Sequence, residues 1–345
     1  MGKNRPVIVL TQKDLMEANC LDMSNVISVV KKALIDFQEG KILFPDKISQ
    51  IFNEETQDRI NCMPATLLEE KICGVKWVSV FPRNPVLYNI PNVSGTIILS
   101  EIVSGQPITF MDGSICTLMR TAAISCIGAE YFAKENSETI GIIGAGEQGR
   151  MHLIAMKTVR PSLKVCKVAS NTIESEKQFE KDMKGIFDDL EIIRCNTNLM
   201  EAAEGSDIIV TATSTQAPLL KADWVGKGAF YAHVGGWEDE FAVAKKADRI
   251  ICDDWEAVKH RTQTLSRMYK AGELSDDDIY ADLHELVVGK KSGRLNDDEF
   301  IYFNSVGLSY VDVALSYVFY KQATECGKGT AIDFQGLSIW DAFKK

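Results

Sequence analysis

The sequence predicts an α/β protein that combines a doubly wound, Rossmann-type parallel sheet with a second, α+β domain. Between residues 138 and 255, short apolar runs alternate with helical stretches, which is the pattern of parallel βαβ units. Between residues 48 and 110, runs rich in β-branched and aromatic residues are separated by Pro, Asn and Gly, which indicates a mostly antiparallel sheet. At 345 residues, the chain is long enough for two domains that each bury a core.

The first domain begins with an apolar strand over residues 6–10 and a helix over residues 25–38. Within the antiparallel sheet, Ser104-Gly105 is expected to form one hairpin turn. Residues 115–134 contain no Pro and no interior polar cluster, so they predict a long helix that leaves this domain.

The second domain begins after Glu138 with the strand Thr139–Ile143. Its apolar runs have no polar face, which suits strands that are buried on both sides. An apolar-periodic helix after Gly307 is expected to return to the first domain. We therefore divide the chain into residues 1–118 with 308–345, and residues 119–307. Further strands of the parallel sheet are expected at residues 164–169, 191–195, 206–214, 228–236 and 247–254.

Composition excludes several classes of protein. The formal net charge is −10 and there is no Lys/Arg block, so binding to nucleic acid or to an anionic membrane is not expected. The nine cysteines are odd in number and form no CxxC pair, and the four histidines form no HxxxH or HxH pair. These counts favour reduced thiols and no metal site. The N-terminus has no apolar signal segment, and we expect a cytoplasmic protein.

A glycine-rich loop gives the strongest functional signal. The sequence Gly144-Ala145-Gly146-Glu147-Gln148-Gly149 follows a predicted strand and opens a helix, which is the context that makes a GxGxxG motif meaningful. Gly144 permits the tight turn, Gly146 lets the backbone approach a pyrophosphate, and Gly149 lets helix and strand pack closely. The helix N-terminus then offers N–H groups to phosphates. The motif predicts a bound dinucleotide.

The residues after the second strand bear on the choice between NAD and NADP. An acid at this point usually binds the ribose of NAD, but the strand ending at Ala169 is followed by Ser170-Asn171-Thr172, and no acid occurs before Glu174. A carboxylate would repel a 2′-phosphate, so its absence removes the usual exclusion of NADP. We expect NAD(P), with a preference for NADP.

Several ordered motifs together make the chain, from about residue 44 to 320, resemble the ornithine cyclodeaminase/μ-crystallin family. This resemblance implies a nicotinamide-dependent enzyme of amino-acid metabolism, a substrate-binding and dimerisation domain in residues 1–118 and 308–345, and an NAD(P)-binding domain in residues 119–307. The motifs are Met63-Pro64-Ala65, Gly74-Val75-Lys76-Trp77, Phe81-Pro82-Arg83-Asn84, Met111-Asp112-Gly113, Leu118-Met119-Arg120-Thr121-Ala122-Ala123, the glycine loop, Thr211-Ala212-Thr213-Ser214 and Ser305-Val306-Gly307.

The resemblance also implies a set of site residues. Lys76 and Arg120 are expected to be catalytic, with Lys76 beside the reacting carbon and Arg120 gripping a carboxylate. Lys47, Met63 and Val306 are expected to contact substrate. The cofactor is expected to contact Asn92, Gly144, Gly146, Glu147, Gln148, Gly149, Ser170, Asn171, Thr172, Thr211, Thr213, Val234, Gly235, Gly236 and Ser305.

Two departures from the family pattern affect the predicted chemistry. Lys47 stands where the family has a carboxylate-binding arginine, which keeps the charge but loses the planar fork. Trp237 stands where cyclodeaminases have a catalytic aspartate directly after the Val-Gly-Gly segment. Either Glu238 or Asp239 replaces that acid, or the acid is absent. Of these alternatives, we expect Asp239 to be the catalytic acid. His233 is a second candidate proton donor.

The leading expectation is an NAD(P)-dependent oxidoreductase that reduces the C=N bond of a small α-imino acid or catalyses the reverse deamination. Two alternatives remain open. One is an ornithine cyclodeaminase that forms proline and ammonia, and the other is a μ-crystallin-like protein that binds NADPH without catalysis. The resemblance further implies a homodimer formed through the sheet of the first domain.

Overall fold

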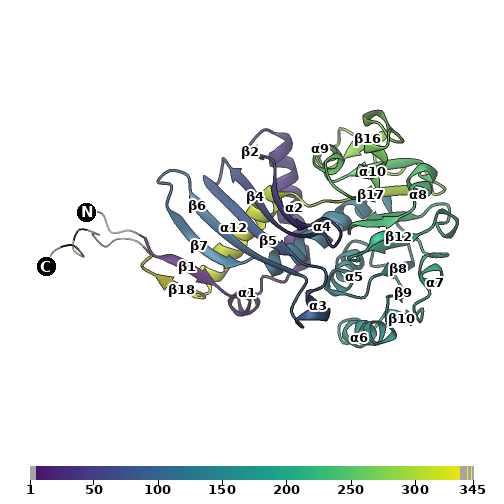
Figure 1. Cartoon of the computed structure of the whole chain (residues 1–345), viewed down its shortest axis with the longest axis horizontal. Helices are drawn as coiled ribbons and strands as arrows, with labels where there is room; N and C mark the ends of the chain where they lie inside the picture. Colours follow the sequence, from purple (N-terminus) through teal and green to yellow (C-terminus); the bar gives the residue numbers. More distant parts are fainter. Residues whose placement is uncertain (1–4, 335–339, 341–342, 344–345) are drawn as a thin grey trace. The chain divides into compact units, whose positions relative to one another are not determined.

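The computed structural model describes residues 5–334, 340 and 343, and its chain separates into two compact units (Figure 1). Unit 1 comprises residues 1–22, 40–117 and 309–345. Unit 2 comprises residues 23–39 and 118–308. Each helix in the described part of the chain is too short or too polar to cross a lipid bilayer.

Unit 1 is built on one eight-stranded sheet with the order β18-β1-β7-β6-β5-β4-β2, and β3 pairs with β4. Each pairing is antiparallel except that of β1 with β7, so the predicted antiparallel sheet is confirmed. Gly105, with φ +73°, lies in the predicted hairpin turn between β6 and β7. The strands are β1 (Val7–Leu10), β2 (Ile42–Leu43), β3 (Ile48–Asn53), β4 (Asp58–Leu67), β5 (Ile72–Val80), β6 (Val93–Glu101), β7 (Pro107–Asp112) and β18 (Thr330–Ile332).

Helix α12 (Ser309–Glu325) packs on one face of this sheet, against β4, β5 and β6 (Figure 1). Because side chains alternate along a strand, this face buries Met63 and Leu99, whereas the other face exposes large apolar side chains such as Trp77 and Phe110. Gly74 permits the close approach of α12, since a Cβ there would lie 2.9 Å from Val313. The remaining helices of unit 1 are α1 (Gln12–Glu17) and α3 (Asn84–Leu87).

Unit 2 contains an eight-stranded, fully parallel sheet with the order β10-β9-β8-β11-β13-β17-β15-β16. The strand order reverses between β8 and β11, so the carboxyl ends of these strands form the switch point at which such sheets bind ligands. The predicted doubly wound sheet is confirmed. The strands are β8 (Thr139–Ile143), β9 (Val165–Ala169), β10 (Glu191–Arg194), β11 (Ile208–Thr211), β13 (Phe230–His233), β15 (Arg249–Cys252), β16 (Ile279–Asp282) and β17 (Ile301–Asn304), and β12 (Gln216–Leu220) pairs with β14 (Trp237–Asp239) in a small separate sheet.

Helices accompany the parallel strands of unit 2 (Figure 1). Helix α4 (Ser114–Phe132) contains the boundary between the units in its first turn. The others are α2 (Met23–Gln38), α5 (Glu147–Val159), α6 (Ile173–Lys184), α7 (Leu199–Ala203), α8 (Phe241–Lys246), α9 (Trp255–Lys259), α10 (Thr264–Lys270) and α11 (Leu283–Val287), with the 3₁₀ turns η1 (Ala222–Trp224) and η2 (Asp276–Asp278).

The compact units differ from the predicted division at helix α2. Its residues were expected in the first domain, but residues 23–39 group with unit 2 because α2 packs against α11 and α5. The ring of His284 lies 5.1 Å from that of Phe37, and its Nδ1 is 2.7 Å from Oε1 of Gln38. The sequence reveals an apolar helix face here, but it does not show which partner covers that face.

Candidate functional site

The glycine turn joins β8 to α5, and its three glycines have different tasks. Gly144 has φ +113°, and a Cβ there would lie 2.5 Å from the carbonyl oxygen of Ala212. A Cβ at Gly149 would lie 2.0 Å from the carbonyl oxygen of Gly144. These two positions therefore need glycine for the fold itself. A Cβ at Gly146 would meet no heavy atom of the described chain within 4 Å, so this position is open for a ligand to approach.

The start of α5 suits an anionic group. Gly146 is the N-cap residue and provides no side-chain cap, so the first N–H groups of the helix are available to an external acceptor. Gln148 Oε1 is buried and has no hydrogen-bond partner among the described residues. An unpaired buried acceptor and open helix amides fit a bound group with both acceptor and donor atoms, as the phosphate and ribose of a dinucleotide have.

The segment after β9 shows a buried acid that the sequence analysis missed. Glu176 is fully buried in the first turn of α6. Its carboxylate accepts hydrogen bonds from the backbone N–H groups of Ser170 at 3.0 Å, Asn196 at 2.8 Å and Thr197 at 2.7 Å. Because these bonds occupy the carboxylate, Glu176 holds two loops together. Asn171 and Thr172, which are exposed between β9 and α6, have no charge, and the exposed Glu174 follows them in the first turn of α6.

Glu238 joins three of the predicted cofactor-binding residues. It is fully buried on β14. Its Oε1 accepts from the Thr213 N–H at 2.6 Å and the Thr213 hydroxyl at 2.7 Å. Its Oε2 accepts from the Thr211 hydroxyl at 2.8 Å and the Gly235 N–H at 2.7 Å. These four bonds tie the end of β11 to the Val234–Gly236 turn after β13, both at the carboxyl edge of the sheet.

Asp239, which the sequence analysis expects to be catalytic, is bonded to two hydroxyl groups inside unit 2. Its carboxylate is fully buried, and it accepts hydrogen bonds from the Thr264 hydroxyl at 2.5 Å and the Tyr302 hydroxyl at 3.0 Å. Burial raises the pKa of Asp239 to about 6, and the nearby His233 opposes this rise. Asp239 points from β14 toward α10, because it alternates with Glu238 along the strand.

His233 is also buried rather than open to a ligand. Its Nδ1 lies 2.8 Å from Asn304 Oδ1, and its Nε2 lies 2.8 Å from the carbonyl oxygen of Gly236. Both ring nitrogens are engaged, so the imidazole links β13, β17 and the turn that follows β13. The structure assigns it a bonding role in this network.

A second buried acid holds the turn that contains Val306. Asp253 is fully buried at the end of β15. Its Oδ2 accepts from the N–H groups of Val306 at 2.9 Å and Gly307 at 2.8 Å. Burial raises the pKa of Asp253 to about 7, and these hydrogen bonds oppose the rise. Gly307 has φ +85°, and a Cβ there would lie 2.2 Å from Nη1 of Arg120. The Arg120 guanidinium therefore rests directly against this turn.

In unit 1, Met63 and Lys76 lie opposite each other on β4 and β5, and Lys47 immediately precedes β3. Ile48 pairs with Cys62, and Met63 pairs with Lys76, so Lys47 precedes a strand that brings it beside Met63. Lys76 is 1% exposed, and its ammonium lies 2.6 Å from the carboxylate of Asp312 on α12. Lys76 therefore points to the face of the sheet that α12 covers. Asn92, half-buried, precedes β6.

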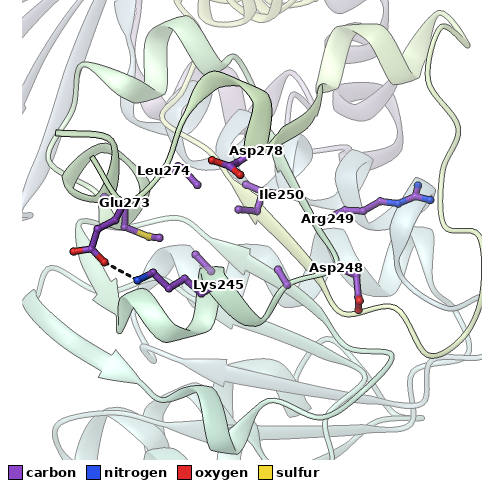
Figure 2. A pocket seen from close by; sticks show the side chains of 10 residues that line it. Lys245, Asp248, Arg249, Ile250, Glu273, Leu274 and Asp278 are labelled. Atoms are coloured by element: carbon purple, nitrogen blue, oxygen red, sulfur yellow. Dashed lines mark hydrogen bonds and ion pairs between the residues drawn. The ribbon is translucent and has the colours of Figure 1, made fainter. Parts of the chain in front are cut away.

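A cavity of about 340 Å³ lies elsewhere in unit 2, between α8, α10 and the amino end of β15 (Figure 2). The ion pair of Lys245 with Glu273, at 2.6 Å, spans part of it, and Asp278 lines it. Because ligands of open parallel sheets bind at the carboxyl ends of strands, this cavity is a poor candidate for a dinucleotide. No described group of three or more His, Cys, Asp and Glu residues is arranged to hold a metal ion.

Comparison with known proteins identifies the family of the chain. The profile of the ornithine cyclodeaminase/mu-crystallin family matches residues 6–327, which confirms the resemblance expected from the motifs. The N-((2S)-2-amino-2-carboxyethyl)-L-glutamate dehydrogenase of Staphylococcus aureus is 29% identical, over 96% of this chain and 99% of that protein.

Two solved structures are similar over nearly their whole length. Thermococcus litoralis Delta(1)-pyrroline-2-carboxylate reductase, in complex with NADH and L-proline, superposes with a TM-score of 0.89 at 31% identity, over 94% of this chain and 99% of that one. An archaeal alanine dehydrogenase dimer with bound NAD superposes with a TM-score of 0.86 at 29% identity, over 95% and 99%.

Proposed function

Because the chain belongs to the ornithine cyclodeaminase/mu-crystallin family, we propose that it is an NAD(P)-dependent oxidoreductase acting on the C–N bond of a small α-amino or α-imino acid. The dehydrogenases and the reductase to which it is similar catalyse reactions of this class. The observation that supports the proposal most is the glycine turn at the switch point. Of its three glycines, Gly144 and Gly149 have no room for a Cβ within the fold, whereas a Cβ at Gly146 would meet no described heavy atom within 4 Å, which leaves space for a ligand.

The cofactor is proposed to lie along the carboxyl edge of the parallel sheet. Its pyrophosphate binds at Gly144–Gly149, and its adenosine ribose lies near Ser170–Thr172. Its nicotinamide lies near Val234–Gly236. When bound, it supplies or accepts a hydride. The other proposed contacts are Thr211, Thr213, Ser305 and Asn92.

NADP is the proposed preference over NAD. The carboxylate of Glu176 is hydrogen-bonded to three backbone N–H groups, so its oxygens are not available to bind a ribose 2′-hydroxyl. The exposed Asn171 and Thr172 are uncharged. Michaelis constants for NADH and NADPH test this point, and a strong preference for NADH would contradict it.

The substrate residues are proposed to share three tasks. Arg120 and Lys47 hold the substrate carboxylate, and Met63 and Val306 form apolar parts of its surroundings. Lys76 donates a proton or hydrogen bond to the imine nitrogen, and its contact with Asp312 keeps the ammonium oriented. Asp239 is proposed to act indirectly, by holding the Tyr302 hydroxyl, which lies 3.1 Å from Nδ1 of His233.

The structure gives no support to ornithine cyclodeamination. Trp237 follows Gly236 and has no acidic group, while the two acids after it are occupied by internal hydrogen bonds. A cyclodeaminase needs an acid near the substrate amine, but reduction of a C=N bond needs only a nicotinamide, a carboxylate grip and one proton donor.

A homodimer through the open face of the unit 1 sheet is also proposed. This face exposes Trp77, Ile98 and Phe110 at 40–47% of their surface, on three strands that lie side by side as β5-β6-β7. A contiguous apolar patch of this kind marks an interaction surface. The similar alanine dehydrogenase is a dimer. Light scattering measures the mass, and Trp77→Glu should yield monomers.

The nine cysteines support a cytoplasmic location. All nine are free thiols, and six of them are buried, which suits a reducing compartment. Burial raises the pKa of Cys20 and Cys195 to about 11, so these thiols resist oxidation.

The proposed reaction is tested by following oxidation of NADH and NADPH with cyclic ketimines and with 2-oxo acids plus amines. We expect turnover with at least one imine. Release of proline from ornithine without net cofactor oxidation would instead show a cyclodeaminase. Cofactor binding without turnover would leave the μ-crystallin-like alternative. Lys76→Ala should abolish turnover and leave cofactor affinity unchanged.

A further inference from the structure

We propose that unit 2 contains a subsite for a second carboxylate of the substrate, formed by the guanidinium of Arg267 and the indole N–H of Trp237. The proposal rests on the proposed function and narrows its substrate class to an imino or amino acid with an acidic side chain. It follows from the placement of Arg267 on α10, from its terminal nitrogens, which meet no acceptor among the described residues, and from its contact with Trp237.

Helix α10 begins at the carboxyl edge of the parallel sheet. Gln263, its N-cap residue, donates from Nε2 to the carbonyl oxygens of Gly235 at 2.7 Å and Ser305 at 2.9 Å. Gly235 belongs to the turn proposed to lie near the nicotinamide, and Ser305 is another proposed cofactor contact. Arg267 follows Gln263 by four residues and therefore lies on the same helix face, one turn away. This places a cation next to the proposed reaction site.

The side chain of Arg267 is held in place by two contacts, but no carboxylate of the described residues pairs with its charge. Its Nε donates to the carbonyl oxygen of Thr262 at 2.8 Å, and its Cζ lies 4.4 Å from the centre of the Trp237 ring. Its two terminal nitrogens have no acceptor, and it has no acidic partner, in the part of the chain that the structure describes. A guanidinium stacked on an indole keeps its fork flat and preorganised for a bidentate carboxylate.

Trp237 adds a donor of its own. Its Nε1 is buried and has no hydrogen-bond partner among the residues that the structure describes. Neither neighbouring acid forms an ion pair with Arg267, because Glu238 points to the opposite side of β14 and Asp239 is bonded to Thr264 and Tyr302. A carboxylate oxygen of a ligand can satisfy the indole N–H.

This arrangement selects between substrate classes. A side-chain carboxylate would form charge-assisted hydrogen bonds with Arg267. An ammonium, as on ornithine, would meet a like charge and find no acceptor. A small apolar side chain would leave the guanidinium unpaired. The subsite thus favours imines of dicarboxylic 2-oxo acids.

Calorimetric binding to the full-length protein saturated with oxidised cofactor tests the subsite without requiring turnover. The probes are 2-oxoglutarate and 2-oxobutanoate, which differ in the distal carboxylate. We expect the wild type to bind 2-oxoglutarate more tightly. Arg267→Met should weaken that binding roughly ten- to hundredfold and leave 2-oxobutanoate within about twofold. Arg267→Lys should retain part of the preference, and Trp237→Phe should lose part of it.

The matched control is Lys221→Met, which removes another cation stacked on an indole, 5.6 Å from the Trp224 ring. This variant should keep the preference for 2-oxoglutarate. Equal binding of both probes by the wild type, or an equal loss for both in Arg267→Met, would overturn the subsite. Because binding is measured, failure of the proposed function appears separately, as absent turnover with bound cofactor.

Discussion

Replacing Glu238 by glutamine tests whether one buried carboxylate organises the carboxyl edge of the parallel sheet. Each carboxylate oxygen accepts one backbone N–H, Oε1 from Thr213 and Oε2 from Gly235. An amide has one acceptor oxygen and one NH₂ group. In either orientation, glutamine therefore directs its NH₂ group at a backbone N–H, and one of the two donors loses its acceptor.

The cost follows from these contacts. A buried backbone donor without an acceptor costs about 1–3 kcal/mol, and the remaining bonds lose the assistance of the negative charge. We expect Glu238→Gln to lower the free energy of unfolding by roughly 2–4 kcal/mol. The turns at Thr213 and Gly235 are proposed to contact the cofactor. If their loss of order weakens cofactor binding by about 1.4 kcal/mol, the cofactor Kd rises roughly tenfold.

Urea denaturation measures the first quantity, and fluorescence titration with NADH and NADPH measures the second. The matched control is Glu240→Gln, because Glu240 lies two residues away and makes no capping hydrogen bond with its side chain. This control should change neither value. A Glu238→Gln protein as stable as Glu240→Gln, with unchanged cofactor affinity, would refute the reasoning.

Three further changes have defined outcomes. Gly307→Ala places a Cβ 2.2 Å from Nη1 of Arg120 at φ +85°, so it should cost about 1–2 kcal/mol in unfolding free energy and raise the substrate KM; an unchanged KM would count against the contact. Burial raises the pKa of Asp253 to about 7, whereas the pKa is near 3.9 in the unfolded chain. The free energy of unfolding of the wild type, relative to that of Asp253→Asn, should therefore fall as pH rises from about 4 to 7. A difference between the two proteins that stays constant over this pH range, measured by urea denaturation, would contradict this. Asp312→Asn removes the counter-charge 2.6 Å from the Lys76 ammonium and should cost about 3–5 kcal/mol; a loss below about 1 kcal/mol would argue against a buried ion pair.

Local patterns predicted the parts of the fold that depend on short stretches of chain. The parallel sheet follows from short apolar runs such as Ile208–Val210, and the turn after β8 follows from the spacing of Gly144, Gly146 and Gly149. In each instance, the periodicity or turn chemistry is contained in adjacent residues.

Contacts between distant residues were not predictable in the same way. Lys76 and Asp312 are separated by 236 positions, and nothing near Asp312 in the sequence identifies its partner. Glu238 was considered as a replacement for a missing acid, yet it accepts four hydrogen bonds from residues on two other segments. A buried acid with several backbone donors has no local sequence pattern. The sequence shows only that an acid follows a family motif, and it does not show to which side of the strand the carboxylate points.

The most direct test of the central claim is the affinity of Gly146→Ala for NADH and NADPH. The added methyl group meets no heavy atom of the described chain within 4 Å, and the backbone at this position has φ −77°, so thermal unfolding should stay as in the wild type. A pyrophosphate lying against this residue would collide with the methyl group, and both Kd values should rise roughly tenfold or more. A folded Gly146→Ala protein that binds both cofactors as tightly as the wild type would show that the dinucleotide does not lie along this turn.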